Sequence, residues 1–221
     1  MMCCRSFLAT TLLLAVASVP SVSAGEACTG GACSGEACPV STAMNKLPKI
    51  TYKVGADEVC CAEAAATLAE TSGSPIVYLV GKQSFDSEAT AMTTLVEATE
   101  KFVGDFATPS KCEVSGTTTV AGKEVCCDVS AAETAKIVAA AMKKVEMTYL
   151  VGEQQCECPD QAAALAKETG KPQLFVVDGQ PTCCSTTARL KLAQAKYKAA
   201  VEALVAAEAK SATPTASTNE S

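Results

Sequence analysis

Short apolar and β-branched runs recur along the chain, each followed by a glycine turn, a second short run and an alanine-rich segment. The two runs around each glycine turn predict a β-hairpin. The alanine-rich segments predict helices, since alanine has the highest helix propensity. We count about five hairpin-plus-helix units, starting near residues 50, 75, 117, 147 and 173. Helices on one face of small antiparallel sheets predict an α+β fold.

Part of this pattern is repeated at a fixed distance. A shift of 97 residues aligns 50–80 with 147–177 without a gap, and the identities include the glycines of the first turns, Gly55 and Gly152. We therefore predict an internal duplication in which both segments read strand, turn, strand, helix, strand. A shorter copy of the second strand and helix start begins at Lys123.

Changes in composition divide the chain into five parts. We expect a secretory signal peptide at 1–24, a flexible cysteine-bearing arm at 25–37, a first hairpin-helix module at 38–107 and a second at 111–210. The polar residues 211–221 predict a disordered tail. We expect each module to have its own core.

The signal peptide is predicted from three features. Arg5 is followed by an apolar stretch at 7–19, and Val22-Ser23-Ala24 has the small residues that a signal peptidase needs. We expect the mature chain to begin at Gly25, with no stable membrane span after cleavage, and to be secreted or periplasmic. The alternative is an uncleaved N-terminal anchor.

Charge and composition exclude several functions. The net charge of −6 gives no basic surface for nucleic acid. The chain has no His, which excludes catalytic triads and metal sites that use it. Since no carboxylate pair, phosphate loop or nucleophile elbow is present either, we do not predict an enzyme. A metal ion is the expected partner, and the sequence does not identify a protein partner.

Cysteines are the main candidates for chemistry. The chain has 14, of which 12 remain after the predicted cleavage. Four of the five units carry cysteines where the second strand meets the helix, namely Cys60-Cys61, Cys126-Cys127, Cys156 with Cys158, and Cys183-Cys184. A helix start offers unpaired N–H groups and the positive end of the helix dipole, which favour thiolate over thiol.

Neighbouring cysteines are poorly placed to bond to each other. Adjacent Cα atoms are about 3.8 Å apart, less than the usual disulfide span of about 4.4 Å or more. We therefore expect each pair to converge with a further sulfur and to bind copper or zinc, which all-sulfur sites suit. The further sulfur is expected from Cys38 for Cys60-Cys61, from Cys112 for Cys126-Cys127, and from Cys156 or Cys158 for Cys183-Cys184. The candidate metal ligands are Cys38, Cys60, Cys61, Cys112, Cys126, Cys127, Cys156, Cys158, Cys183 and Cys184.

One stretch resembles a known family. Cys38-Pro39-Val40, a strand-glycine-strand segment, Val59-Cys60-Cys61 and a helix resemble the small YHS/TRASH metal-binding modules. The resemblance covers about residues 38–70, with a fainter copy at 112–140. It implies treble-clef-like units that handle heavy metals, copper included.

Two other functions remain open. An even number of cysteines in an exported protein is ordinarily a disulfide framework, which would make this a structural or interaction protein of the cell envelope. Thiol-disulfide redox activity is the third reading, although the sequence contains no C-x-x-C motif.

Overall fold

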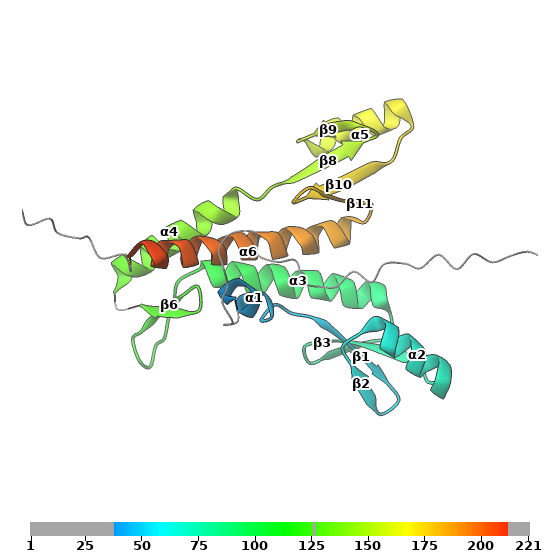
Figure 1. The fold of residues 1–221 in the computed structure, drawn as a ribbon, viewed down its shortest axis with the longest axis horizontal. Helices are drawn as coiled ribbons and strands as arrows, with labels where there is room; N and C mark the ends of the chain where they lie inside the picture. Colours follow the sequence, from blue (N-terminus) through cyan, green and yellow to red (C-terminus); the bar gives the residue numbers. More distant parts are fainter. Residues whose placement is uncertain (1–37, 126, 212–221) are drawn as a thin grey trace, which may run out of the picture. The chain divides into compact units, whose positions relative to one another are not determined.

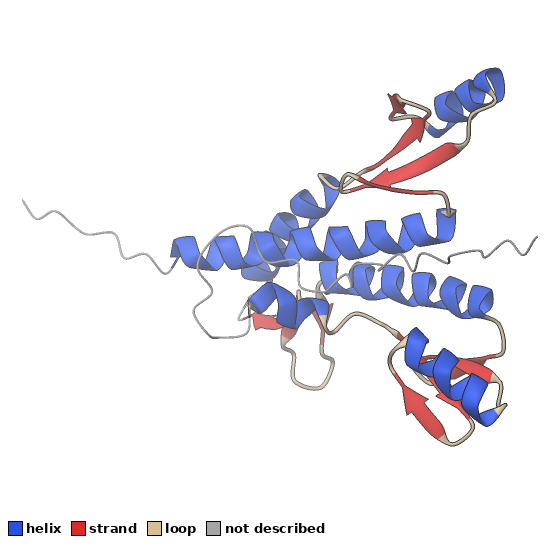
Figure 2. Ribbon diagram, turned by 45° about the vertical axis from the view of Figure 1, so that its right-hand side comes forward, coloured by secondary structure: helices blue, strands red, loops and turns tan. Residues whose placement is uncertain are grey.

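A computed structural model describes residues 38–125 and 127–211, all within one compact unit of the chain (Figure 1). The predicted signal peptide and arm, Cys126 and residues 212–221 lie outside the described residues. Within the described ranges the fold is mixed, with six helices and three small antiparallel sheets (Figure 2), consistent with the predicted α+β class. In this part of the chain, no helix is both long and apolar enough to cross a membrane.

The first sheet has four strands in the order β2-β1-β3-β4. Its strands are β1 (Ile50–Val54), β2 (Asp57–Val59), β3 (Ile76–Val80) and β4 (Gln83–Phe85). Two helices pack against these strands, α2 (Ala62–Ser72) and α3 (Glu88–Ala107).

The second four-stranded sheet has the order β9-β8-β10-β11. Its strands are β8 (Met147–Val151), β9 (Gln154–Cys156), β10 (Gln173–Val177) and β11 (Gln180–Thr182). The helices against it are α5 (Pro159–Thr169) and α6 (Ser185–Ser211). The predicted order strand, strand, helix, strand is confirmed over 50–80 and 147–177, and Ser211, predicted as the start of the tail, ends α6.

The third sheet has the order β5-β6-β7 and lies between the other two in the sequence. It consists of β5 (Ser110–Lys111), β6 (Thr118–Val120) and β7 (Lys123–Val125), followed by α4 (Asp128–Lys143). Two elements were not predicted, β5 and the short helix α1 (Pro39–Met44), where the sequence has no long apolar period.

The predicted glycine turns join the hairpin strands. Gly55 and Gly152 lie between paired strands with φ of +62° and +64°, a region that L side chains rarely adopt. A Cβ at Gly152 would also lie 2.6 Å from the side-chain Cδ of Lys171. Both glycines are therefore placed in turns, as the sequence predicts.

Each helix that follows a hairpin is anchored by one alanine, four residues after the residue that caps the helix. The small side chain lets the helix backbone lie close to the strands, as expected in a densely packed core. These alanines are at most 3% exposed and are Ala65, Ala91, Ala131, Ala162 and Ala188. The strand before each hairpin turn ends in a buried valine, and these are Val54, Val80, Val120, Val151 and Val177.

Helix α6 joins the two predicted modules. It packs against α4, α3 and α1 (Figure 1). Tyr197 of α6 is 1% exposed, and its ring makes edge contacts with Phe102 and Phe106 of α3 at centroid distances of 5.3 and 4.8 Å. Leu47 and Val103 belong to the same core cluster. The expectation of separate cores for 38–107 and 111–210 is therefore wrong, because α6 buries its apolar side chains against both.

Candidate functional site

The residue that caps each of the five helices after a hairpin occupies the same backbone position. Its carbonyl oxygen accepts a hydrogen bond of 2.9 to 3.1 Å from the buried alanine described above. The capping residues are Cys61, Ser87, Cys127, Cys158 and Cys184. Four of these five positions therefore present a thiol at a helix start, as the sequence predicts.

Cys156 occupies a different position from these thiols. It is the last residue of β9 and is 3% exposed, packed with Tyr149, Val151 and Ala162. The corresponding residue of β2 is Val59. The side chain at this point of the strand faces the core, so Cys156 acts as a small apolar residue in this structure.

The other cysteines at helix starts are exposed. Cys60, Cys61, Cys158, Cys183 and Cys184 are free thiols on the surface. The backbone at Cys61 is extended, with φ −115° and ψ 129°. Successive side chains of an extended backbone point to opposite sides. The sulfurs of Cys60 and Cys61 are therefore not arranged to bind the same metal ion.

The predicted convergence with Cys38 is not found. No group of three or more Cys, Asp or Glu side chains suited to a metal ion occurs within residues 38–125 and 127–211. Cys38 caps α1, whose residues pack into the Tyr197 cluster, whereas Cys60 and Cys61 follow the edge strand β2. Helix α1 was not predicted from the sequence, so it was also not predicted that Cys38 lies apart from this edge.

The predicted convergence of Cys156 or Cys158 with Cys183 and Cys184 is not found either. Strand pairing places Cys156, Tyr149, Phe175 and Thr182 in one row across the second sheet. Neighbouring strands are about 4.8 Å apart, so the two ends of this row are separated by roughly 14 Å. The two groups of cysteines lie at opposite edges of the sheet.

The third sheet brings its cysteines to one end. Residues Lys111, Thr118 and Val125 form one row, and the outer strands β5 and β7 run in the same direction. Cys112 directly follows β5, where its N–H donates to the Thr117 carbonyl at 2.9 Å. Cys127 caps α4 two residues after β7, and Cys126, which lies between them, is outside the described residues.

The turn after Cys112 directs hydrogen-bond donors at its sulfur. The Gly116 N–H donates to the Cys112 carbonyl at 2.8 Å, and Gly116 has φ +69°. Hydrogen bonds from the hydroxyl and backbone N–H of Ser115, and then from the Val114 N–H, lower the pKa of the Cys112 thiol. The sequence signal for this turn is Ser115-Gly116, which our sequence reasoning missed.

Cys184 shows the effect predicted for a helix start. The backbone N–H of Thr187, its hydroxyl and the N–H of Thr186 lower the pKa of the Cys184 thiol. A related contact occurs at α4, where the Cys127 sulfur lies 3.3 Å from the Ser130 hydroxyl. In both cases a hydroxyl residue three positions into the helix faces the capping sulfur.

We predict that Thr187 sets the reactivity of Cys184. In a Cys183→Ser background, alkylation by iodoacetamide should reach half its maximal rate below the pH of an ordinary thiol, because only the thiolate reacts. Thr187→Val removes the hydroxyl donor and should move this pH upward, with a rate at pH 7 about three- to tenfold lower. Thr187→Ser should keep the parent profile. Peptide mass spectrometry measures the rates, and identical profiles for all three proteins would contradict the assignment.

No protein-family model, curated protein or solved structure matches the chain. The functional proposal therefore depends on the thiol geometry alone.

Proposed function

We propose that this chain is an exported, cysteine-rich protein that binds soft metal ions through thiolates, as a binding protein rather than an enzyme. Copper or zinc is the expected metal. Residues 1–24 are removed on export in this proposal, and the mature protein works in a secreted or periplasmic location. Thiolate sulfur is the soft ligand that selects such ions, and the chain has no His to contribute.

The observation that carries the proposal is the turn at Cys112. A metal ligand must be deprotonated, and three hydrogen bonds already favour the thiolate of Cys112. Cys127 caps α4 close to the same end of the three-stranded sheet. We propose that Cys112 and Cys127, with Cys126, form the principal site.

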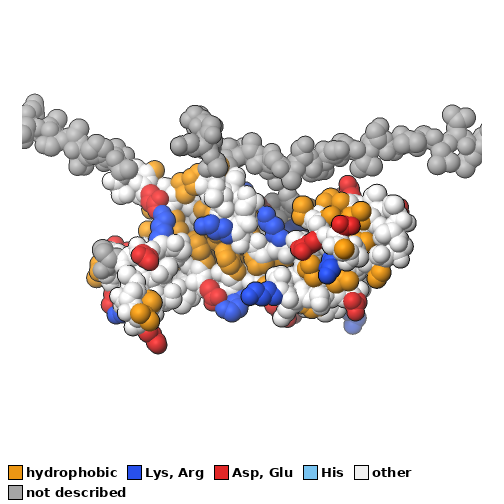
Figure 3. Space-filling view, turned by 90° about the horizontal axis from the view of Figure 1, so that it is seen from below, with side chains coloured by type: hydrophobic (Ala, Val, Ile, Leu, Met, Phe, Trp, Pro, Cys, Tyr) orange, Lys and Arg blue, Asp and Glu red, His pale blue; other side chains and the backbone are white. Residues whose placement is uncertain are grey.

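The exposed thiols favour Cu(I) over Zn(II). Structural zinc takes four ligands in a tetrahedron. Besides the proposed site at Cys112, Cys126 and Cys127, the described residues offer single and paired thiols at the helix starts and no group of three candidate ligands. Cu(I) accepts sites with few sulfur ligands more readily than zinc does. On the face drawn in Figure 3, neither acidic nor basic side chains form one continuous field.

We also propose that the chain consists of five related hairpin-helix units and contains an internal duplication. Each strand of the second four-stranded sheet, and α5, starts and ends 97 residues after its counterpart. The ring pairs support the same proposal, since Tyr52–Tyr78 and Tyr149–Phe175 both have centroids 5.8 Å apart in an edge arrangement. Each copy of the hairpin-helix unit therefore contributes one helix start and one capping residue.

The proposal is tested on protein recovered from the exported fraction. We expect elemental analysis to find bound copper or zinc, thiol counting to find reactive cysteines, and intact mass to show a chain beginning at Gly25. Cys112→Ser and Cys127→Ser should each lower the metal content by about one ion per chain, because a site that loses a sulfur loses most of its affinity.

Cys156→Val is the matched control. It removes a thiol from the core and introduces the residue that β2 carries at the same point, so the metal content should not change. A recovered protein with neither metal nor reactive thiols would contradict the proposal and leave the disulfide framework as its explanation. An equal loss of metal in Cys156→Val would show that the Cys112 site is not specific.

A further inference from the structure

A groove occurs at the same place beside both four-stranded sheets. The groove is lined by the segment before the sheet's first strand, by the turn between its third and fourth strands, and by the long helix that follows. The first groove includes Pro48, Lys49, Gly81 and Ala98. The second includes the residues 97 positions later, which are Val145, Glu146, Asp178 and Ala195. The fold therefore builds this concavity twice.

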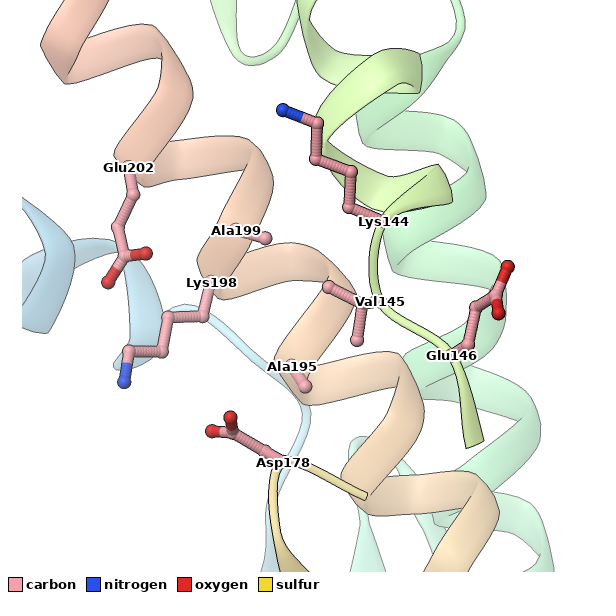
Figure 4. A pocket seen from close by; sticks show the side chains of 8 residues that line it. All are labelled: Lys144, Val145, Glu146, Asp178, Ala195, Lys198, Ala199 and Glu202. Atoms are coloured by element: carbon pink, nitrogen blue, oxygen red, sulfur yellow. The ribbon is translucent and has the colours of Figure 1, made fainter. Parts of the chain in front are cut away.

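The two grooves differ in size and charge. Their volumes are about 700 Å³ for the first and about 280 Å³ for the second. In the second groove Lys144 and Lys198 are accompanied by Glu146, Asp178 and Glu202. Figure 4 shows Lys198 on the same side of the groove as Asp178 and Glu202. The second groove thus has three carboxylates against two lysines, which makes its lining slightly acidic.

The first groove is basic. Lys46, Lys49 and Lys82 line it, with Glu58 as the acidic residue. Glu58 accepts a 3.0 Å hydrogen bond from the Thr51 hydroxyl, and the Lys49 ammonium donates to the neutral side chain of Asn45 at 3.2 Å. None of the three lysines forms an ion pair with a described residue. Three lysines and one glutamate therefore line one concavity, which gives it a net positive lining in a protein of net charge −6.

The groove also offers neutral hydrogen-bond donors. Gln83 and Thr94 line it from β4 and α3. Val80, which is 5% exposed, also lines it. Ammonium, amide and hydroxyl donors that line one open groove suit a ligand rich in acceptor oxygens.

We propose that the first groove binds a small, multiply charged oxyanion, carrying phosphate or carboxylate groups, and that the second groove does not. The positive charges attract the anion. This site uses none of the cysteines, so the anion-binding proposal is independent of the metal-binding proposal.

The test titrates the full mature protein with inorganic pyrophosphate and, in a second arm, with citrate, at low ionic strength. Calorimetry gives the affinity, and amide chemical shifts give the location. We expect saturable binding to at least one probe, with shifts at Thr51, Gln83 and Thr94. The probe that binds with the higher affinity shows whether phosphate or carboxylate is the preferred ligand group.

Lys49→Glu installs the residue that the second groove carries at this position. We expect it to weaken binding about tenfold or more, since it replaces attraction by repulsion. Lys136→Glu, at an exposed position of α4, makes the same change in net charge away from the groove and should change affinity less than about twofold.

Three results would overturn the proposal. The first is an equal loss of affinity in both variants, which would indicate attraction to net charge alone. The second is a set of chemical shifts confined to the cysteines, which would indicate exchange of bound metal with the probe. The third is self-association without any probe that Lys49→Glu abolishes in sedimentation experiments. That result would make the acidic groove of a second copy the occupant.

Discussion

Tyr197→Ala should lower the free energy of unfolding by about 3–5 kcal/mol, the range for removing a large ring from a packed core. Tyr197 is the largest fully buried side chain among the described residues. Its ring contacts Phe102 and Phe106 of α3, and its cluster also contains Leu47. The cavity would open where α6 joins the first part of the chain to the second. Urea denaturation followed by circular dichroism measures the loss.

Tyr197→Phe is the control for this prediction. It keeps the ring and should cost less than about 1.5 kcal/mol, the usual limit for swaps that conserve volume. Burial raises the pKa of the Tyr197 hydroxyl, so the group is neutral at ordinary pH. The shared core also predicts one cooperative transition. Two transitions in Tyr197→Ala, one at the parent midpoint, would show that the modules have separate cores after all.

Ala91→Leu should destabilise the protein by about 1–3 kcal/mol, because extra methylene groups do not fit a packed core without strain. Ala91 is fully buried against Val80 and Leu95. Its N–H donates to the Ser87 carbonyl at 3.1 Å, so the first turn of α3 is held where the larger side chain would need space. Thermal and urea unfolding both report the change.

The neighbouring exposed position supplies the comparison. Ala89→Leu keeps the helix propensity similar and should change stability by no more than about 0.5 kcal/mol. Equal effects at 89 and 91 would mean that α3 does not lie close to its sheet. A loss at Ala188→Leu similar to that at Ala91→Leu would extend the packing rule to α6.

The sequence predicts the local structure well because its signals are local. A glycine between two short β-branched runs specifies a hairpin whatever surrounds it, and Gly55 and Gly152 lie in turns as predicted. An alanine-rich segment after a strand specifies a helix start within one or two residues, which is why Cys61 and Cys158 were placed correctly.

The tertiary arrangement was harder to predict. Helix α1 has six residues and is held by packing against the Tyr197 cluster, a contact with residues about 150 positions away that no local pattern reveals. The distance between Cys38 and Cys60 depends on that helix. Cys156 was predicted as a ligand because it lies where the second strand meets the helix, but the alternation of the strand turns it toward the core.

The caps of the hairpin helices show how the thiol content of this protein can change. At Cys61, Ser87, Cys127 and Cys158 the side chain makes no capping hydrogen bond, and the backbone carbonyl alone accepts the bond from the buried alanine. The start of these helices therefore does not depend on a capping hydrogen bond from the side chain at this position. Single exchanges between Ser and Cys can add or remove a surface thiol, one unit at a time, while the scaffold is inherited unchanged.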